Sequence, residues 1–344
     1  MIRNDIKALA AYHVPDSGGM IKLDAMENPY NLPDEVRQEW LEKLALVDLN
    51  RYPDSNMLLL RQKIAARDGV EPEQVLLGNG SDEIIQMLLL AMNPGTCVVP
   101  RPTFVMYDMV SRWLKRPVAS VPLKDDFSLD ADYFLQVCGR EKAEIAFLAC
   151  PNNPTGNLWD EAVVQRIARG MSGHLIIDEA YGPFSEHSYT SMISTKVMVL
   201  RTFSKLGWAA LRLGYLLGDA EQISQLNKVR MPYNINGLTQ ASALFLLDKS
   251  ELFEQQAAMI CAERERVFER LSRLDQVTLF PSKTNFLLLR VPDAGVLFDG
   301  LKKAGILIKN MHGSDPLLTQ CVRITIGSKE ENSAVIAVIE ELLR

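Results

Sequence analysis

A repeated pattern between residues 74 and 218 constrains the fold of this chain more than any other feature. Short apolar runs alternate there with loops rich in glycine, proline or asparagine, and the loops lead into segments with helical spacing of apolar residues. The apolar runs lie at residues 74–77, 96–99, 144–150, 175–177, 197–200 and 215–217. Nearly continuous runs of this kind are typical of strands that are buried on both faces of a mostly parallel sheet. The pattern therefore predicts an α/β fold.

The rest of the chain predicts a second, smaller α/β unit. One long helix is expected over residues 240–274, where apolar positions recur at helical spacing beside a charged face. After it we expect strands at 285–291, 306–308 and 322–326 and helices at 294–304 and 328–344. The first residues show no sustained period. We predict an N-terminal arm (1–28) associated with the small domain, a large domain (29–248) and a small C-terminal domain (249–344).

The composition is that of a folded globular protein, and it excludes several classes of function. Hydrophobic residues make up 47% of the 344 residues and charged residues 23%. The longest apolar runs are far shorter than the roughly 20 residues of a membrane-spanning helix, and no secretory signal is visible, so we expect a cytoplasmic protein. The net charge of -6, without a basic stripe, argues against nucleic acid as a partner. Histidines and cysteines lack the spacing of metal sites, so no metal is expected.

Loops that follow predicted strands carry the side chains best suited to chemistry, because ligands of an open parallel sheet bind beyond the carboxyl ends of its strands. The loop 78–83, GNGSDE, opens a helix whose N-terminus suits a phosphate, although Ser81 alone could simply cap that helix. The loop 151–156, PNNPTG, offers two adjacent amides but could be only a turn. Both loops remain open to a structural or a binding role.

Two further loops add a buried acid and a lysine. Asp178 ends a predicted buried strand, where a charge is costly without a cationic partner; capping the following segment is the alternative. Lys205 follows another strand, with Thr202 and Ser204 before it and Arg212 shortly after it. These groups would bind a phosphate next to an amine that reacts with carbonyls. Pyridoxal 5′-phosphate has a phosphate for the hydroxyls and the arginine, a carbonyl for the lysine and a ring cation for the buried acid, so one ligand would match all these loops.

An ordered set of motifs extends this argument to a family. The motifs are LDAMENP, RYPD, GNGSDE, PTFVMY, PNNPTG, DEAY, RTFSK, LRLGY, SKTNF and VRITIG, which lie between residues 23 and 327, and the likeness that they carry covers residues 12–327. Together they resemble the histidinol-phosphate aminotransferases, in fold type I of the pyridoxal-phosphate enzymes. PNNPTG, DEAY and SK with its downstream arginine are general to that superfamily, whereas LDAMENP, RYPD, RTFSK and VRITIG point to this family. The resemblance implies a large cofactor-binding domain, with a mostly parallel sheet between helices, and a smaller α/β domain.

The resemblance implies a role in cofactor binding for each matching residue. Lys205 would bond to the cofactor's aldehyde carbon and, once freed, act as the general base, while Asp178 would pair with the ring nitrogen. Tyr181 and Asn153 would hydrogen-bond the ring hydroxyl. Phe104 would stack on the ring, with Tyr107 as the second candidate. The residues expected to hold the phosphate are Ser81, Asp82, Ser204 and Arg212, with Thr202 nearby and Tyr52 reaching in from the other subunit of a homodimer.

The implied reaction is the reversible transamination of L-histidinol phosphate with 2-oxoglutarate, which gives imidazole-acetol phosphate and glutamate in histidine biosynthesis. Arg323 matches the family's anion-binding arginine, Tyr12 matches a substrate-contacting tyrosine of the arm, and Asn153 would also contact substrate. Lys309 stands where many members have a second substrate arginine. A lysine keeps the positive charge there but lacks the planar fork of a guanidinium.

Other functions fit the same motifs. An aromatic-amino-acid aminotransferase or a phosphothreonine-type decarboxylase would keep Lys205, Asp178 and Arg212, and would differ only in pocket residues that one sequence does not rank. A ligand-sensing protein on the same fold is a third alternative. Such a protein would usually have lost the lysine or gained a DNA-binding segment, and the sequence shows neither change.

Overall fold

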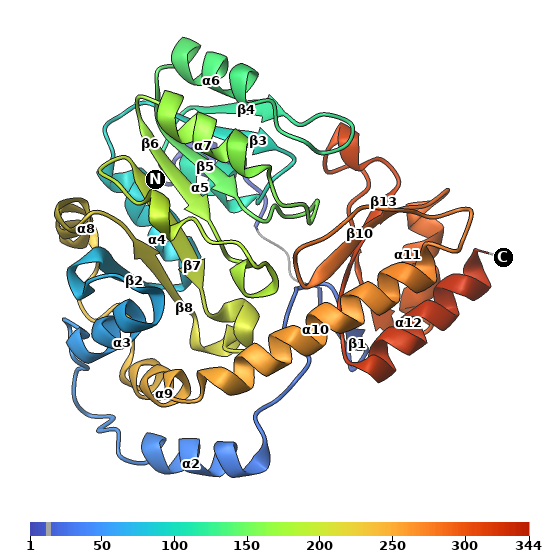
Figure 1. Cartoon of the computed structure of the whole chain (residues 1–344), viewed down its shortest axis with the longest axis horizontal. Coiled ribbons are helices and arrows are strands. Elements are labelled where there is room, and N and C mark those ends of the chain that lie inside the picture. The colour runs from blue at the N-terminus through green and yellow to red at the C-terminus, as the bar shows by residue number, and fades with distance from the viewer. Residues whose placement is uncertain (12–14, 344) are drawn as a thin grey trace.

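The computed structural model describes residues 1–11 and 15–343, and its largest element is a seven-stranded sheet (Figure 1). The strand order is β2-β8-β7-β6-β5-β3-β4. The strands are β2 (Val75–Asn79), β3 (Thr96–Arg101), β4 (Val118–Pro122), β5 (Ala143–Ala149), β6 (His174–Asp178), β7 (Val197–Thr202) and β8 (Leu213–Leu217). Only β8 runs antiparallel to its neighbours. The predicted mostly parallel sheet is confirmed. The apolar pattern does not predict β4, because this edge strand is only partly buried.

Helices cover both faces of this sheet, because successive strand residues point to opposite sides. In β6, Leu175 and Ile177 pack into one core and Ile176 into the other. The first core is completed by α3 (Leu58–Asp68), α6 (Ala131–Arg140), α7 (Glu161–Gly170) and α9 (Gly237–Leu247), the second by α4 (Gly80–Ala91), α5 (Met106–Trp113) and α8 (Ala220–Leu226). The continuous apolar runs of the sequence therefore reflect strands that lie between two helical layers.

Four antiparallel strands form the small sheet, in the order β12-β13-β10-β9. They are β9 (Thr278–Leu279), β10 (Phe286–Arg290), β12 (Lys309–Asn310) and β13 (Cys321–Thr325), and they lie beside α10 (Ser250–Leu271), α11 (Ala294–Lys303) and α12 (Lys329–Leu342) (Figure 1). A separate parallel pair joins β1 (Ile21–Lys22) to β11 (Ile306–Leu307). The strands and helices expected after residue 285 are present, while the domain limits at residues 28 and 248 stay predictions. No helix in the described part of the chain is long and apolar enough to cross a membrane.

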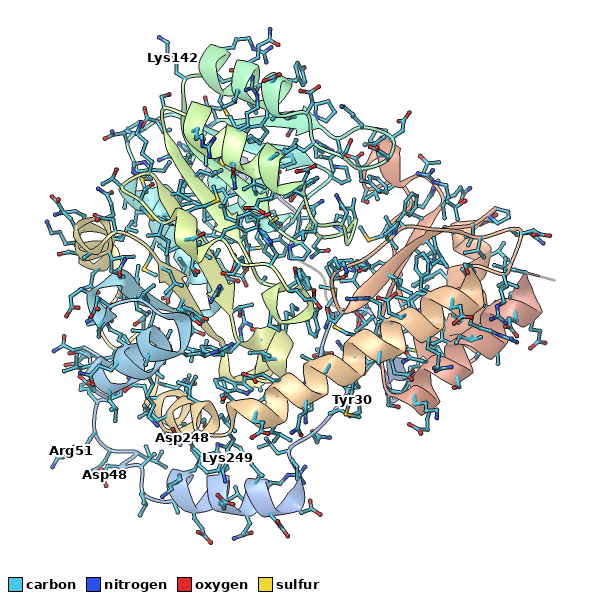
Figure 2. The ribbon with its side chains drawn as sticks, in the orientation of Figure 1. Tyr30, Asp48, Arg51, Lys142, Asp248 and Lys249 are labelled. Atoms are coloured by element: carbon cyan, nitrogen blue, oxygen red, sulfur yellow. The ribbon has the colours of Figure 1, made fainter. Side chains whose placement is uncertain are left out.

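The prediction of a single helix over residues 240–274 is wrong. Two helices, α9 and α10, occupy this range, and the non-helical residues Asp248 and Lys249 separate them (Figure 2). Lys63 of α3 accounts for the end of α9. Its Nζ donates to the carbonyl oxygen of Leu244 (3.4 Å) and also pairs with the Asp248 carboxylate. A cation on these last groups satisfies the carbonyl end of α9, so α10 can leave toward the small sheet in a new direction.

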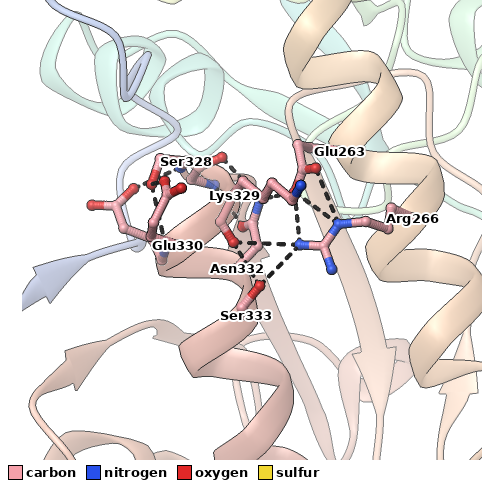
Figure 3. Close-up of polar contacts among 9 residues, drawn as sticks. Glu263, Arg266, Ser328, Lys329, Glu330, Asn332 and Ser333 are labelled. Carbon is pink, nitrogen blue, oxygen red and sulfur yellow. Dashed lines mark hydrogen bonds and ion pairs between the residues drawn. The ribbon is translucent and has the colours of Figure 1, made fainter.

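A polar network fixes α12 against α10 (Figure 3). Ser328 and Glu331 form a capping box at the start of α12: Ser328 Oγ accepts from the Glu331 amide (3.3 Å), and Glu331 Oε2 accepts from the Ser328 amide (2.7 Å). The buried Asn332 donates to Glu263 Oε2 on α10 (3.0 Å) and to the carbonyl oxygen of Gly327 (2.9 Å). Its own Oδ1 accepts from the Gly327 amide (2.9 Å). One side chain thus links two helices and the turn before α12.

Asn332→Ala is expected to lower the free energy of unfolding by about 2 kcal/mol, because it leaves the buried amide and carbonyl of Gly327 without these partners. Urea denaturation followed by circular dichroism measures the change. The control is Glu341→Ala, which changes an exposed residue near the end of the same helix and should alter the free energy of unfolding by less than about 0.5 kcal/mol. Equal losses in both variants would contradict the role given to Asn332.

Candidate active site

One pocket lies where the parallel strands of the large sheet end, and it collects most of the predicted cofactor-binding residues. The predicted residues that line it are Ser81, Asp82, Phe104, Asn153, Asp178, Tyr181, Thr202, Ser204, Lys205 and Arg212. Met26, Tyr107, Ala149 and Ala180 line it as well. Because β5, β6 and β7 are parallel, their carboxyl ends bring the loops that follow them to one edge of the sheet.

Close backbone packing shapes one end of this pocket around the start of α4. Gly80 has a positive φ of +78°, and a Cβ there would lie 2.7 Å from Arg212 Nη2. On β8, a Cβ at Gly214 would lie 2.5 Å from the backbone nitrogen of Ser81. Glycine at both positions therefore lets β8 and the Arg212 side chain approach the first turn of α4. The unpaired N–H groups of a helix start are a ready site for an anion.

Side chains complete this end of the pocket. Arg212 donates through Nη2 to Asp82 Oδ2 (3.2 Å) and through Nη1 to Ser204 Oγ (3.4 Å). Thr202 Oγ1 donates to Ser204 Oγ (3.0 Å). A guanidinium, two hydroxyls and a helix N-terminus form an arrangement that suits a phosphate. The Asp82 carboxylate orients Arg212 through its hydrogen bond, and the role of Asp82 in holding the phosphate stays a prediction.

A buried carboxylate also lines the pocket. Asp178, the last residue of β6, is 3% exposed. Its Oδ1 accepts from the Ala180 amide (2.9 Å), and its Oδ2 accepts from the Tyr107 hydroxyl (2.7 Å). Burial raises the pKa of Asp178 to about 6, although these hydrogen bonds oppose the rise. A buried acid that accepts from a neutral hydroxyl and a backbone amide suits a ligand that brings a positive charge.

Lys205 also lines the pocket and lies in the turn after β7. Its Nζ donates to the carbonyl oxygen of Ala25 (3.2 Å) and lies 5.9 Å from the centre of the Tyr181 ring. Burial, and secondarily the positive charge of Arg323, lowers the pKa of Lys205 to about 8. Near neutral pH a useful fraction of this amine is therefore unprotonated, as a nucleophile or a general base requires.

A chain of hydrogen bonds connects the pocket to the small sheet. Asn153 Nδ2 donates to the Tyr181 hydroxyl (3.0 Å), and Arg323 Nη1 donates to Asn153 Oδ1 (2.5 Å). Arg323 Nη2 also donates to the carbonyl oxygen of Asp24 (2.9 Å). On the small sheet Lys309 is the cross-strand partner of Arg323, so the two side chains leave the same face. Two cations therefore belong to the sheet face next to the pocket.

The two aromatic candidates for ring stacking differ in their packing. Phe104 is partly buried and meets the Tyr107 ring edge to face, with centroids 5.5 Å apart. Tyr107 is fully buried and stacks on Phe147 of β5, with centroids 4.6 Å apart. Since Phe147 takes a face of the Tyr107 ring, Phe104 is the better candidate for stacking on a ligand.

Besides Arg323 and Lys309, which belong to the small sheet, two predicted site residues are not found among the residues that line this pocket. Tyr52 is 81% exposed on the surface and stacks on Tyr233, with ring centroids 4.5 Å apart and an interplanar angle of 16°. Tyr12 lies outside the described residues. The structure of one chain therefore leaves the roles of both tyrosines as predictions.

An ion-pair network behind the pocket was not predicted from the sequence. Arg201 Nη2 lies 2.7 Å from Glu179 Oε2, and Arg201 Nη1 lies 3.0 Å from Asp68 Oδ2. Arg201 directly precedes Thr202, and Glu179 directly follows Asp178. The pair with Glu179 therefore links the ends of β6 and β7, and the pair with Asp68 links β7 to the end of α3. The only signal in the sequence is a charged residue directly beside each of two buried strand runs.

Comparisons with known proteins agree with this geometry. The family model described as "Aminotransferase class I and II" matches residues 18–339. "Histidinol-phosphate aminotransferase 2" of Cupriavidus pinatubonensis is 47% identical over 343 residues, which cover 97% of this chain and 94% of that protein. "Histidinol-phosphate aminotransferase 1" of Burkholderia lata is 46% identical over 346 residues, which cover 99% of this chain and 97% of that protein.

A solved structure shows the same fold. Histidinol-phosphate aminotransferase from Sinorhizobium meliloti, in complex with pyridoxal-5′-phosphate, aligns with a TM-score of 0.90 at 24% sequence identity. The alignment covers 100% of this chain and 97% of that chain. This structure confirms the predicted fold, and the family model and the two relatives confirm the family that the motifs predict. The chain belongs to the aminotransferase class I and II family.

Proposed function

We propose that this protein is a pyridoxal-phosphate-dependent aminotransferase that exchanges an amino group between L-histidinol phosphate and 2-oxoglutarate. The observation that carries the proposal is the single pocket that contains Lys205, Asp178 and Arg212. The substrate is supported by relatives of 46% and 47% identity that are named for this activity. The products would be imidazole-acetol phosphate and glutamate.

The pocket fits pyridoxal phosphate at each of its polar positions. Arg212, Ser204 and the start of α4 would hold the phosphate, and Asp178 would face the ring nitrogen. Asn153 and Tyr181, which already share a hydrogen bond, would bind the ring hydroxyl. When bound, this cofactor supplies an electron sink that stabilises negative charge on the substrate carbon bearing the amino group.

Lys205 would move the proton in this reaction. Because burial lowers its pKa to about 8, Nζ can accept a proton from the substrate carbon that bears the amino group and can release it again. The Ala25 carbonyl, 3.2 Å from Nζ, restricts where the amine can lie. A restrained amine of moderate basicity suits a proton transfer that must run in both directions.

Arg323 and Lys309 would recognise the second anion of the substrates. Histidinol phosphate presents a phosphate and glutamate a carboxylate, so one site must accept both groups. Arg323 can bind either anion through two parallel N–H donors, and Lys309 adds a second charge on the same sheet face. Asn153, held by Arg323, joins this site to the cofactor pocket.

We also propose that the protein works as a homodimer, in which Tyr52 reaches the phosphate end of the partner's pocket. The chain segments that contain Tyr52 and its stacking partner Tyr233 expose several more large apolar side chains, namely Leu46, Leu49, Leu58 and Met231. Hydrogen bonding of Arg230 Nη2 to the Ser55 carbonyl (3.0 Å) brings the two chain segments of this surface together. Large exposed apolar patches usually mark protein interfaces.

The proposed reaction predicts that protein loaded with pyridoxal phosphate forms glutamate from histidinol phosphate and 2-oxoglutarate. Glutamate dehydrogenase coupled to NAD⁺ reduction measures the rate. Lys205→Ala should lose about 10²- to 10⁴-fold in rate, since it removes the general base. Lys142→Ala, at an exposed position, is the control and should leave the rate unchanged (Figure 2).

The alternatives give different outcomes in the same experiment. A chain that forms no glutamate from histidinol phosphate, but forms it from phenylalanine, would be an aromatic-amino-acid aminotransferase. Carbon dioxide released from a phosphorylated amino acid would indicate the decarboxylase. Either outcome would contradict the proposed substrate but would agree with the proposed roles of Lys205, Asp178 and Arg212 in binding the cofactor.

The basicity of Lys205 predicts how the cofactor-free protein reacts with acetic anhydride. Only the neutral amine is acylated, so labelling of Lys205 should rise with pH and level off above about 8. An ordinary lysine would continue to gain reactivity up to a pH of about 10.4. Mass spectrometry after brief labelling gives the curve for Lys205, with exposed Lys142 as the internal reference. Indistinguishable curves for the two lysines would contradict the lowered pKa.

The proposed dimer predicts that Leu49→Asp yields a monomer in sedimentation velocity at micromolar concentration, because it places a charge in the apolar patch. The dimer dissociation constant should rise at least about 100-fold. Affinity for pyridoxal phosphate should fall with it, because Tyr52 of the partner no longer contributes. Val296→Asp replaces an exposed apolar residue on α11 and should leave the dimer intact. A monomeric wild-type protein would refute the proposal.

A further inference from the structure

We infer that the Tyr107 hydroxyl is the group that orients the Asp178 carboxylate toward the cofactor and keeps it ionised. The inference rests on the proposed cofactor and deepens it. In this reading Tyr107 does not stack on the ligand. It is a positioning residue, because it acts through Asp178.

The geometry leaves the carboxylate little freedom. Tyr107 donates to Oδ2 (2.7 Å), and the backbone amide of Ala180 donates to Oδ1 (2.9 Å). Both Asp178 and Tyr107 are buried, so neither hydrogen bond competes with bulk water. Rotation of the carboxylate would break both hydrogen bonds. Since each oxygen keeps further acceptor capacity, the carboxylate can still bind a ligand N–H.

The Tyr107 ring is itself held in place by packing. It lies in the first turn of α5 and stacks nearly parallel on Phe147 of β5, at an interplanar angle of 10°. Phe104 meets its edge at 86°. These contacts depend on the ring and not on the hydroxyl, so a phenylalanine at position 107 should fill the same space.

The charges around Asp178 show why a donor is needed. Burial raises its pKa to about 6, and the negative charges of Asp82 on α4 and Glu179 after β6 act in the same direction. Tyr107 makes the strongest of the contacts that lower it. The other titratable groups of the pocket are Tyr181, Lys205 and Arg212. Without the hydroxyl, the Asp178 pKa should move toward neutral pH, where a protonated carboxyl no longer stabilises a ring cation.

The test is the affinity of cofactor-free protein for pyridoxal phosphate, measured by absorbance titration between about pH 5.5 and 8. Tyr107→Phe should weaken binding about tenfold at pH 7. The pH at which affinity is half lost on the acid side should rise by about one unit. Tyr189→Phe is the matched control. It also removes a buried tyrosine hydroxyl, but that hydroxyl contacts Cys150 Sγ (3.3 Å) and should leave both quantities unchanged.

A double-mutant cycle separates positioning from general packing. In an Asp178→Asn background there is no carboxylate to ionise, so Tyr107→Phe should have almost no further effect on affinity or on its pH dependence. An equal effect in both backgrounds, or none in either, would overturn the inference. The wild-type protein could prove inactive on histidinol phosphate while Tyr107→Phe still shifts the pH dependence of pyridoxal phosphate affinity. That result would support the role of Tyr107 and refute only the proposed substrate. Wild-type protein that does not bind pyridoxal phosphate would refute both.

Discussion

Burial of β5, β6 and β7 between two helical layers is the constraint on which the site depends. Side chains along these strands face apolar cores on both sides, so polar groups can meet a ligand only where the strands end. Asn153, Asp178 and Lys205 each come from the end of a different strand. The same loss of water acts on two of them in opposite directions, because it disfavours charge: the pKa of Asp178 rises and that of Lys205 falls. The burial that forms the two apolar cores thus also shifts the pKa values of Asp178 and Lys205.

The pocket also depends on the contact between the two sheets. Arg323 belongs to the small sheet, but its hydrogen bond to Asn153 reaches the large one, and its charge is the second cause of the lowered pKa of Lys205. The segment before Asn28 runs between the sheets, where Asp24 and Ala25 offer carbonyl oxygens to Arg323 and Lys205. A change in the relative position of the sheets would therefore alter both the substrate cation and the basicity of the lysine.

Much of this arrangement could be predicted from the sequence, because the information is local. Each site loop follows an apolar run, and parallel strands bring such loops to one edge. What could not be predicted depends on contacts between distant residues. Lys63 ends α9 from another helix, the edge strand β4 lacks an apolar signature, and the Tyr107 hydroxyl meets Asp178 only after folding. The individual roles came from the family resemblance, and Tyr52 cannot be assigned to a site from one chain.

The reversed direction of β8 has a consequence for how this enzyme family can vary. Because β8 opposes its neighbours, its first residue lies at the edge where β7 ends, so the connection 203–212 leaves that edge and returns to it. Lys205 stands at the departure and Arg212 at the return. Lys205 is therefore positioned by the end of β7 and Arg212 by the start of β8, at one edge of the sheet. An insertion into this connection would therefore act on the positions of Lys205 and Arg212 together, which an insertion after β5 or β6 would not do.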